Sequence, residues 1–140
     1  MRFSSVAVDD LAGGEMAVAH LLSVGRQRIA FVGGPEKIRQ EAARPDAIFA
    51  ANDLLAVGVL QGLMLMGGVR VPEEIALIGY DDIEFAAAAV VPLSSIRQPS
   101  ALFGSTALEL LLRDASQESG FVPRQVVFPP ELVVRASTQA

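Results

Sequence analysis

The 140-residue sequence contains no cysteine, a single histidine and a single lysine. Without cysteine it can form no disulfide, no thiolate metal site and no cysteine nucleophile. Long apolar runs are missing as well, because glycine, glutamine or a charged residue interrupts each one before the roughly 20 residues that a membrane span requires. The chain is nevertheless 51% hydrophobic, which is enough to bury the core of one domain or of a small two-lobed unit.

Positive charge is scarce. Sixteen acidic residues against eleven basic ones give a formal net charge of −5 and an isoelectric point of about 4.8. The basic residues are scattered singly and form no stripe that could neutralise phosphates, so we expect no direct binding to nucleic acid. The N-terminal sequence MRFSSVAVDD does not read as a signal peptide, and we expect a cytoplasmic protein that is not attached to a membrane.

Several catalytic and nucleotide-binding signatures are absent from the sequence. It has no G-x-S-x-G nucleophile elbow, no G-x-G-x-x-G and no G-x-x-x-x-G-K-[ST] phosphate loop. Asp9-Asp10 could open the acidic pocket of a receiver domain, but the next predicted strand ends in glycines and the one lysine is Lys37. His20 lies among apolar residues and is interpreted as structural. We expect no catalytic residue, metal or cofactor; a Mg²⁺-dependent enzyme using acid pairs such as Asp9-Asp10 is the less favoured alternative.

Two hydrophobic periodicities alternate along the chain. Short runs rich in β-branched residues predict strands, and the longer apolar stretches between them predict helices. Continuous apolar strands separated by helices indicate an α/β fold with a mostly parallel sheet that is covered on both faces. The predicted strands are residues 4–8, 28–33, 46–50, 74–79 and 125–128, and the predicted helices are roughly 11–24, 53–66 and 100–114.

Polar residues gather where the predicted strands end. In open α/β sheets, ligands bind at the carboxyl ends of the strands, so these residues could line a crevice. Aspartate and asparagine are also preferred caps at the start of helices, and either role explains a single pair. For any single pair we favour the cap, and the coincidence of several clusters keeps the ligand role open for Asn52 and Asp53. The clusters are Asp9-Asp10, Asn52-Asp53 and Tyr80-Asp81-Asp82.

The predicted helix 53–66 is apolar around its whole circumference, with Gln61 as its only strongly polar member. A helix of this kind must be buried on every side. The similarly apolar segment 84–91 could cover it, or a second copy of the chain could cover both. A symmetric homodimer is the simplest closed arrangement, and we expect one in which Leu60 and Met64 contribute to the contact.

Several phrases of the sequence resemble, in the same order, the effector-binding core of LacI-family bacterial transcriptional regulators. They are VDDLAGGEMAVAHLL, RIAFVGGP, PDAIFAANDLLAVGVLQGL, VRVPEEIALIGYDDIEFA, PLSSIRQP and PELVVRAST. The resemblance implies two α/β lobes with a parallel-sheet, periplasmic-binding-protein-like architecture, joined by three crossing strands around a small effector. It implies a first, incomplete lobe of residues 1–40 and 98–126, and a second lobe of residues 41–97 and 127–140.

The resemblance also implies roles for individual residues. At the seam of residues 52 and 53 we expect Asp53 to begin the helix and Asn52 to face the ligand. Asn52 matches a cleft asparagine of the family, Asp81 an aspartate that binds sugar hydroxyls, and Asp9 a cleft aspartate of the first lobe. Val57 and Ala89 fall in elements that the family uses for dimer contact. The candidate effector-binding residues are Asn52, Asp81, Asp9, Tyr80 and Gln98, and the candidate dimer contacts are Val57, Leu60, Met64 and Ala89.

The chain departs from the family in two places. No helix-turn-helix precedes the first predicted strand, so operator binding is not carried over. At Gln40–Glu41 the family has two further strand–helix units, about 50–60 residues at about 30 per unit, and the arginine that anchors effector there is lost with them. We therefore expect a truncated domain that binds a sugar-like effector weakly or not at all and that dimerises. A stand-alone sugar-binding protein of the periplasmic type is the alternative.

Overall fold

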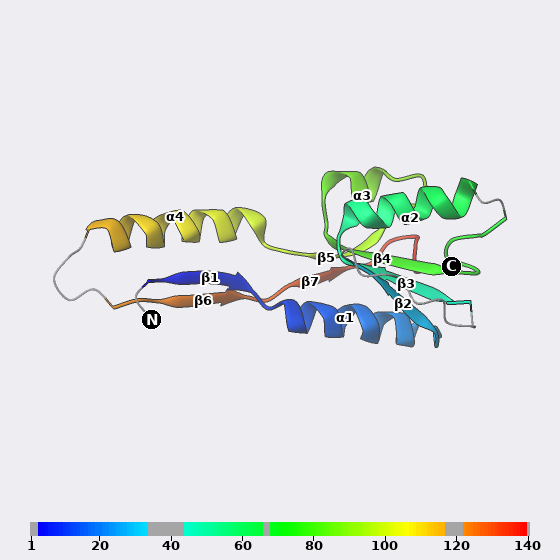
Figure 1. Ribbon diagram of the computed structural model, residues 1–140, viewed down its shortest axis with the longest axis horizontal. Helices are drawn as coiled ribbons and strands as arrows, with labels where there is room; N and C mark the ends of the chain where they lie inside the picture. The colour runs from blue at the N-terminus through cyan, green and yellow to red at the C-terminus, as the bar shows by residue number, and fades with distance from the viewer. Residues whose placement is uncertain (1–2, 34–43, 66–67, 117–121, 140) are drawn as a thin grey trace.

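The computed structural model describes residues 3–33, 44–65, 68–116 and 122–139 of the chain. Figure 1 shows an elongated molecule with a five-stranded sheet at one end and a smaller unit of two strands and one helix at the other. The elements, in chain order, are β1 (Ser5–Val8), α1 (Asp10–Ser23), β2 (Ile29–Val32), β3 (Ala47–Ala50), α2 (Asp53–Leu65), β4 (Ala76–Asp81), α3 (Glu84–Ala88), β5 (Ser94–Arg97), α4 (Ser100–Ser116), β6 (Gln125–Phe128) and β7 (Glu131–Val133).

The larger unit, which we call the sheet unit, is built on strands in the order β2-β3-β4-β5-β7. The first four run parallel, and β7 pairs antiparallel with β5 at one edge. Parallel neighbours need crossover connections; α2 lies in the one from β3 to β4 and α3 in the one from β4 to β5. The predicted α/β fold with a mostly parallel sheet is therefore confirmed.

Both faces of this sheet are covered, because successive residues of its strands, which point to opposite faces, are both buried. On β4, Leu77 packs with residues of α2 and α3, whereas Ile78 and Tyr80 pack with residues of α1. Figure 1 shows α2 and α3 above the sheet and α1 below it. Such two-sided burial explains why these strands read as continuous apolar runs in the sequence.

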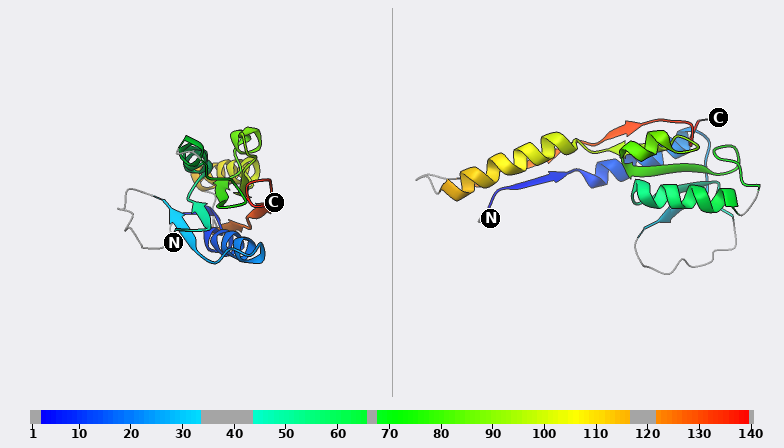
Figure 2. Two further views of the ribbon diagram at one scale, coloured as in Figure 1. Left: turned by 90° about the vertical axis from the view of Figure 1, so that its right-hand side faces the viewer. Right: turned by 90° about the horizontal axis from the view of Figure 1, so that it is seen from above.

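The smaller unit, which we call the strand-pair unit, consists of β1, β6 and α4. β1 and β6 form a parallel pair with Ser5 opposite Gln125 and Val8 opposite Phe128. α4 packs on β1. The right-hand view in Figure 2 also places this unit at the end of the molecule away from the five-stranded sheet. The chain passes between the units at three places: after β1, after β5 and before β7.

The structure corrects the expected division into lobes. Residues 1–40 were expected to share a lobe with 98–126, but α1 packs on the five-stranded sheet and β2 pairs with β3. The cause is the apolar face of α1, where Ala17 and Leu21 are fully buried against β3, β4 and β5. Within residues 3–33, only β1 joins α4 and β6, so the first crossing falls next to Asp9.

The predicted strands and helices agree with the observed ones to within two residues at each end. β5 and β7 are not predicted: β5 begins with Ser94 and Ser95, both fully buried, and β7 has three residues, so neither shows an apolar periodicity. The apolar segment 84–91 forms α3 and a short extension. The predicted connection across residues 34–45, including the joint at Gln40–Glu41, falls almost entirely on residues 34–43, outside the described part of the chain.

His20 has the structural role expected of it. It is half-buried, its Nε2 lies 2.7 Å from the hydroxyl oxygen of Thr138, and burial lowers its pKa. None of the helices that the structure describes is both long and apolar enough to cross a membrane.

Candidate functional site

β4 ends in two consecutive aspartates with left-handed backbone, φ +100° at Asp81 and +54° at Asp82. This conformation costs a non-glycine residue of order 1–3 kcal/mol and persists only where neighbouring contacts hold it. Aspartate tolerates it better than most residues because its short side chain can bond locally. The contacts that hold this corner therefore decide where the two carboxylates point.

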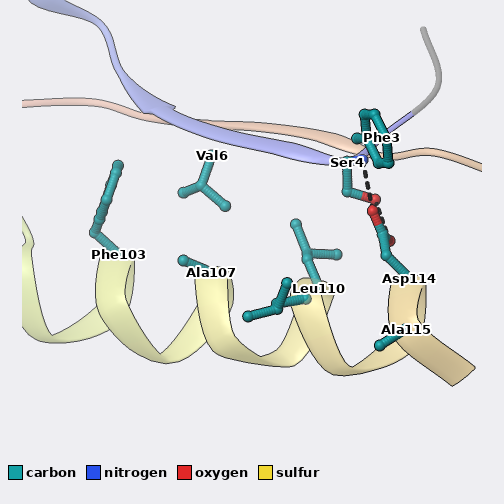
Figure 3. A pocket seen from close by; sticks show the side chains of 9 residues that line it. Phe3, Ser4, Val6, Phe103, Ala107, Leu110, Asp114 and Ala115 are labelled. Carbon is teal, nitrogen blue, oxygen red and sulfur yellow. Dashed lines mark hydrogen bonds between the residues drawn. The ribbon is translucent and has the colours of Figure 1, made fainter.

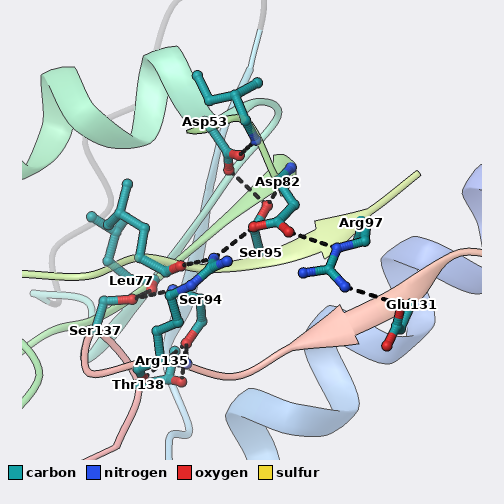
Figure 4. A network of polar contacts seen from close by, with 12 residues as sticks. Asp53, Leu77, Asp82, Ser94, Ser95, Arg97, Glu131, Arg135, Ser137 and Thr138 are labelled. Atoms are coloured by element: carbon teal, nitrogen blue, oxygen red, sulfur yellow. Dashed lines mark hydrogen bonds and ion pairs between the residues drawn. The ribbon is translucent and has the colours of Figure 1, made fainter. Parts of the chain in front are cut away.

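Asp82 is fixed by two arginines (Figure 4). Its side chain is 5% exposed, and its carboxylate oxygens lie 2.7 Å from Arg97 Nε and 2.6 Å from an Arg135 terminal nitrogen. Its backbone N–H donates to Ser95 Oγ at 3.0 Å, and Arg97 reaches on to Glu131 at 3.4 Å. This group, which we call the Asp82 cluster, ties the end of β4 to β5 and β7 at two of the three crossings.

The charges of the cluster agree with this geometry. Burial alone would raise the pKa of Asp82, but hydrogen bonds and charges from Arg135 and Arg97 outweigh it and hold that pKa below its ordinary value. Asp82 therefore stays ionised at neutral pH although it is nearly inaccessible to water.

Asp81 is exposed, in contrast to Asp82. Its Oδ1 accepts a hydrogen bond from Gln98 Nε2 at 2.6 Å. Partial burial raises the pKa of Asp81; the bond from Gln98 opposes this rise, and the nearby charge of Asp10 adds to it. Asp81, Gln98 and Asp10 belong to three stretches of chain that meet where it crosses between the units. Two carboxylates beside an amide offer both acceptors and donors to a ligand rich in hydroxyl groups.

Tyr80 is not open to this space. It is 9% exposed, its ring packs with α1, and its hydroxyl donates to Asp10 Oδ1 at 2.7 Å. Burial, together with the hydrogen bond and charge of Asp10, raises the pKa of Tyr80 far above its usual range. Gly13 makes the approach possible, since a Cβ at that position would overlap the tyrosine ring. Tyr80 thus orients Asp10 at the edge of the site.

The two members of the first acid pair, Asp9 and Asp10, make different contacts in the structure. Asp9 caps α1, because its Oδ1 accepts a hydrogen bond from the Ala12 backbone at 3.0 Å. Asp10 carries the contact to Tyr80 and the electrostatic influence on Asp81. A cap must precede the first helical residue, and that rule could have separated the two aspartates.

Asp53 is the first residue of α2, as expected, but the helix is capped by Asn52 and not by Asp53. Asn52 is the cap of α2: its Oδ1 accepts from the Leu55 backbone at 2.9 Å. Its side-chain NH₂ has no hydrogen-bond partner within the described residues, and the residue is half-exposed. Asn52 can therefore begin the helix with one atom and still donate to a ligand with the other.

Asp53 is fully buried and faces the protein. Its two oxygens accept hydrogen bonds from Ser95 Oγ at 2.7 Å and from the Ile83 backbone at 2.9 Å (Figure 4). Gly79 provides the space, because a Cβ there would overlap the carboxylate. Burial raises the pKa of Asp53 and those two bonds oppose the rise. Asp53 therefore connects α2 to the end of β4 and to β5. In the sequence this role could not be recognised, because Asp53 is followed by the apolar residues Leu54 and Leu55.

The expected dimer surface also needs one correction. Leu60 is 1% exposed and belongs to the core beneath α2, so it cannot contact a partner. Val57 and Ala89 are partly buried against the same core, which shows that α3 covers α2 in part. Met64 is 49% exposed. Apolar side chains that remain exposed on α2 and in 84–91 are Leu54, Leu55, Met64, Leu65, Phe85 and Val90.

No three histidine or acidic side chains in the described ranges are placed to hold a metal ion together. The site consists instead of carboxylate and amide groups at the carboxyl edge of a parallel sheet, next to three crossings between two units. Crossings of this kind join the lobes of proteins that close around a ligand by a hinge motion.

Comparison with known proteins agrees with this architecture. Residues 34–138 match the family described as periplasmic binding protein-like domain, so the chain belongs to that family. Its relatives are LacI-family repressors, among them the ribose operon repressor of Escherichia coli strain K12, which is 38% identical over 110 residues, or 76% of this chain and 33% of that protein. The predicted resemblance is confirmed.

Solved structures show the same fold. A complex of the transcriptional regulator CelR with cellobiose matches 97% of this chain and 54% of its own, with 28% identity and a TM-score of 0.82. The lac repressor dimer bound to operator and the anti-inducer ONPF matches 97% of this chain and 53% of its own, with 26% identity and a TM-score of 0.83. The chain thus spans about half of these structures and about a third of the curated relatives.

Proposed function

We propose that the chain is the effector-binding and dimerisation part of a LacI-type transcriptional regulator, and that it is not catalytic. One observation carries the proposal. Asp81 stands exposed beside Gln98 and Asp10 at the crossings, on a backbone that the Asp82 cluster holds in place. A ligand bound there touches the stretches of chain that connect the two units, so that binding can be converted into a change of their relative position.

The chemistry of these groups favours a polyol such as a sugar. Vicinal hydroxyls donate to carboxylates and accept from amides, and bonds to charged acceptors are the stronger ones. Asp81 and Asp10 supply the acceptors. Gln98 and the NH₂ of Asn52, which has no partner among the described residues, supply donors. The solved relative that holds cellobiose supports this class of ligand.

We also propose that affinity for such a ligand is weak. A two-lobed domain encloses its ligand between two walls, and the described strand-pair unit provides only two strands and one helix opposite the sheet unit. An incompletely enclosed polyol keeps competing with water for its hydrogen bonds. We expect dissociation constants above about 1 μM for mono- and disaccharides.

Titration calorimetry with a panel of sugars tests the affinity, and amide chemical shifts at high sugar concentration test the location. We expect shifts at Asn52, Asp81 and Gln98, and their loss in Asp81→Asn. The matched control is Glu109→Gln, at an exposed acid of α4 away from the site. Submicromolar binding would contradict the weak affinity; shifts confined to other residues, or no shifts with any sugar, would contradict the site.

The exposed apolar side chains of α2 and the 84–91 segment support a homodimer through this face. Leu54 is 68% exposed, Phe85 69% and Val90 69%, next to the partly buried Val57 and Ala89. A patch of this kind on one side of a small domain is best covered by a second copy, as in a symmetric dimer. We propose that Val57, Met64 and Ala89 border the contact and that Leu54 and Phe85 lie within it.

Sedimentation equilibrium tests the dimer. Leu54→Glu places a carboxylate in the first turn of α2, where it suits the helix dipole, so the fold should persist while the dimer dissociates about tenfold more readily or further. Leu108→Glu on α4, at a leucine that is 57% exposed, is the control and should leave the association unchanged. A wild-type monomer, or equal effects of the two changes, would refute this face.

A further inference from the structure

The junction beside Asp81 holds carboxylates without matching cations. Asp9, Asp10 and Asp81 are exposed, and none of them forms an ion pair within the described residues. The Asp82 cluster contributes no spare positive charge, because its two arginines are paired with Asp82 and Glu131. Three negative charges therefore remain uncompensated where the chain crosses between the units.

These three carboxylates come from different elements but act on one tyrosine. The Tyr80 hydroxyl donates to Asp10 Oδ1 at 2.7 Å, and Tyr80 directly precedes Asp81 in β4. Burial raises the pKa of Tyr80 most and the bond to Asp10 adds to it; the charges of Asp10, Asp81 and Asp9 raise it further. The first crossing and the end of β4 thus bring three like charges within electrostatic range of the same hydroxyl.

Each carboxylate also keeps one oxygen without a donor among the described residues. The bonds from Tyr80, Gln98 and the Ala12 backbone reach only the Oδ1 atom of their respective carboxylates. An ionised carboxylate has about four acceptor positions and no donor. Groups that donate, such as hydroxyl and ammonium, therefore complement the junction. A phosphate ester, which carries about two negative charges and further acceptor oxygens, does not.

The arrangement of the acidic groups suits a molecule better than a single ion. In the described ranges, no three acidic or histidine side chains are placed to hold a metal ion together. Asp9 and Asp10 lie at the first crossing, Asp81 at the end of β4 and Gln98 at the next crossing. A ligand that reaches all these positions must carry donors at several places, as a polyol does.

An apolar cavity beneath α4 provides a contrast with this junction (Figure 3). Its volume is about 570 Å³, and residues of the N-terminal stretch and of α4 line it. The carboxylate in its lining, Asp114, already accepts hydrogen bonds at 2.9 Å from the backbone and the hydroxyl of Ser4. The cavity offers little to a polar ligand, so the amides of Ala107 and Leu110 in its lining serve as internal controls.

We propose that the junction selects its effector by charge: it accepts neutral polyols, binds those with an ammonium group more tightly and rejects phosphorylated ones. The inference rests on the function proposed above and narrows its class of ligand. A site lined by charge of one sign concentrates the opposite charge and repels its own. An ammonium group can bond to the unoccupied oxygens of Asp10 and Asp81 without displacing Tyr80 or Gln98.

Asp10 is the specificity-determining residue of this junction. The Tyr80 bond fixes its carboxylate next to β4, and its charge, together with burial, raises the pKa of Asp81. Asp10→Asn keeps an oxygen that can accept from Tyr80 and removes one charge, so it changes the electrostatics and preserves the contact. Glu15→Gln is the matched control. Glu15 is an exposed acid of the same helix, about 200° around the axis from the buried Ala17.

The test uses the whole 140-residue chain and three sugars that differ only at carbon 6: glucose, 6-amino-6-deoxyglucose and glucose 6-phosphate. Amide shifts of Asn52, Asp81 and Gln98 give the dissociation constants, and those of Ala107 and Leu110 should not change. At about 10 mM salt we expect the amino sugar to bind about fivefold more tightly than glucose, and the phosphate at least about tenfold more weakly. Both differences should shrink at about 1 M salt, where the screening length is about 3 Å.

The two variants assign the selectivity to the junction. In Asp10→Asn the ratio of amino-sugar to sugar-phosphate affinity should fall at least about threefold, and in Glu15→Gln it should keep the wild-type value. Equal binding of the three sugars, tighter binding of the phosphate, selectivity that salt does not weaken, or equal effects of the two variants overturns the proposal and leaves the effector site in place. No shift at Asn52, Asp81 and Gln98 with any of the three sugars overturns the selectivity and the proposed function together.

Discussion

The two units of the molecule bury their apolar sequence to very different degrees. In the sheet unit, five of the six residues of β4 are buried, and α2 buries its inner side against the strands. In the strand-pair unit, α4 has 17 residues, of which only Leu110 is buried, and β1 and β6 alternate between exposed and half-buried positions. A strand or helix buries what its neighbours cover, and two strands with one helix provide few neighbours.

Polar side chains follow the same contrast. The buried polar residues of the described chain all lie in the sheet unit, where Asp53, Ser94, Ser95, Ser137 and Thr138 are at most 2% exposed. Each is hydrogen-bonded: Ser94 to Thr138, Ser95 to Asp53, and Ser137 to the Leu77 carbonyl. Buried polar groups are tolerated only when they are paired, and pairing fixes geometry. The unit with the complete core is thus also the one that can hold Asp81 and Asp82 in a strained conformation.

The largest expected difference between the units is the cost of removing a core leucine. Leu77→Ala should lower the free energy of unfolding by about 2–5 kcal/mol, because Leu77 is fully buried in a close-packed layer. Leu110→Ala should cost less than about 2 kcal/mol, since Leu110 already borders a cavity and loses fewer contacts. Urea unfolding followed by circular dichroism measures both. Equal losses would mean that the strand-pair unit is packed as tightly as the sheet unit.

Disrupting the Asp82 cluster should have the second-largest effect on the free energy of unfolding. Asp82→Asn removes a nearly inaccessible charge from two arginines and should destabilise the protein by about 1.5–3 kcal/mol. The side chain of Arg97 is 45% exposed, so solvent weakens the contribution of its ion pair with Asp82 to stability. The Arg135 side chain is 18% exposed, and its ion pair should contribute more. The exposed Asp81→Asn serves as control and should cost clearly less. If both changes had the same small effect, the cluster would not hold the corner.

The pH dependence of this loss has a definite sign. The pKa of Asp82 is lowered in the folded protein, so its contribution is complete above the unfolded value of about 3.9 and is lost as the pH falls through the folded value. The difference between wild type and Asp82→Asn should therefore shrink on acidification. The pKa of Asp53 is raised, so its ionisation costs stability as the pH rises from about 3.9 through the folded value. The free energy of unfolding of Asp53→Asn should therefore rise relative to that of the wild type over that range. Profiles of unfolding free energy against pH that run parallel for wild type and variants would contradict both assignments.

Much of the fold could be predicted because the sheet unit follows simple periodic rules. Strands such as AIFA are buried on both faces and read as apolar runs, and α1 and α2 have clear first and last residues. β5 could not be predicted, because its serines are buried through hydrogen bonds to Asp53 and to residues 135–138, contacts that lie about 40 residues away in the chain. The placement of residues 9–33 failed for a related reason, since strand pairing is decided by partners far along the chain.

The structure brings two of the predicted site residues into contact and gives the members of each polar pair different partners. Parallel strand ends bring Asp81 and Gln98 together as the fold class requires. Which aspartate of a pair is buried depends on the far side of the contact. Gly79 opens a space for Asp53, and Tyr80 bonds to Asp10 while both Asp9 and Asp10 stay exposed. The residues that pack against a polar pair at a strand end therefore decide which contacts each member makes.

Substitution of Asn52 should have the smallest effect on stability, and two variants can separate its roles as helix cap and as ligand donor. Asn52→Ala should cost about 1 kcal/mol, because the Leu55 backbone loses its capping acceptor, and it should also remove the NH₂ that we assign to the effector. Asn52→Ser keeps an oxygen that can accept from Leu55 and should restore most of the stability, but it has no amide to donate. Unfolding by urea measures the cap, and sugar-induced shifts at Asp81 and Gln98 measure the ligand contact. If Asn52→Ser restored both the stability and the sugar-induced shifts, Asn52 would act only as a helix cap. If it restored the stability but not the shifts, the result would place the Asn52 amide in the ligand site at the junction with the strand-pair unit.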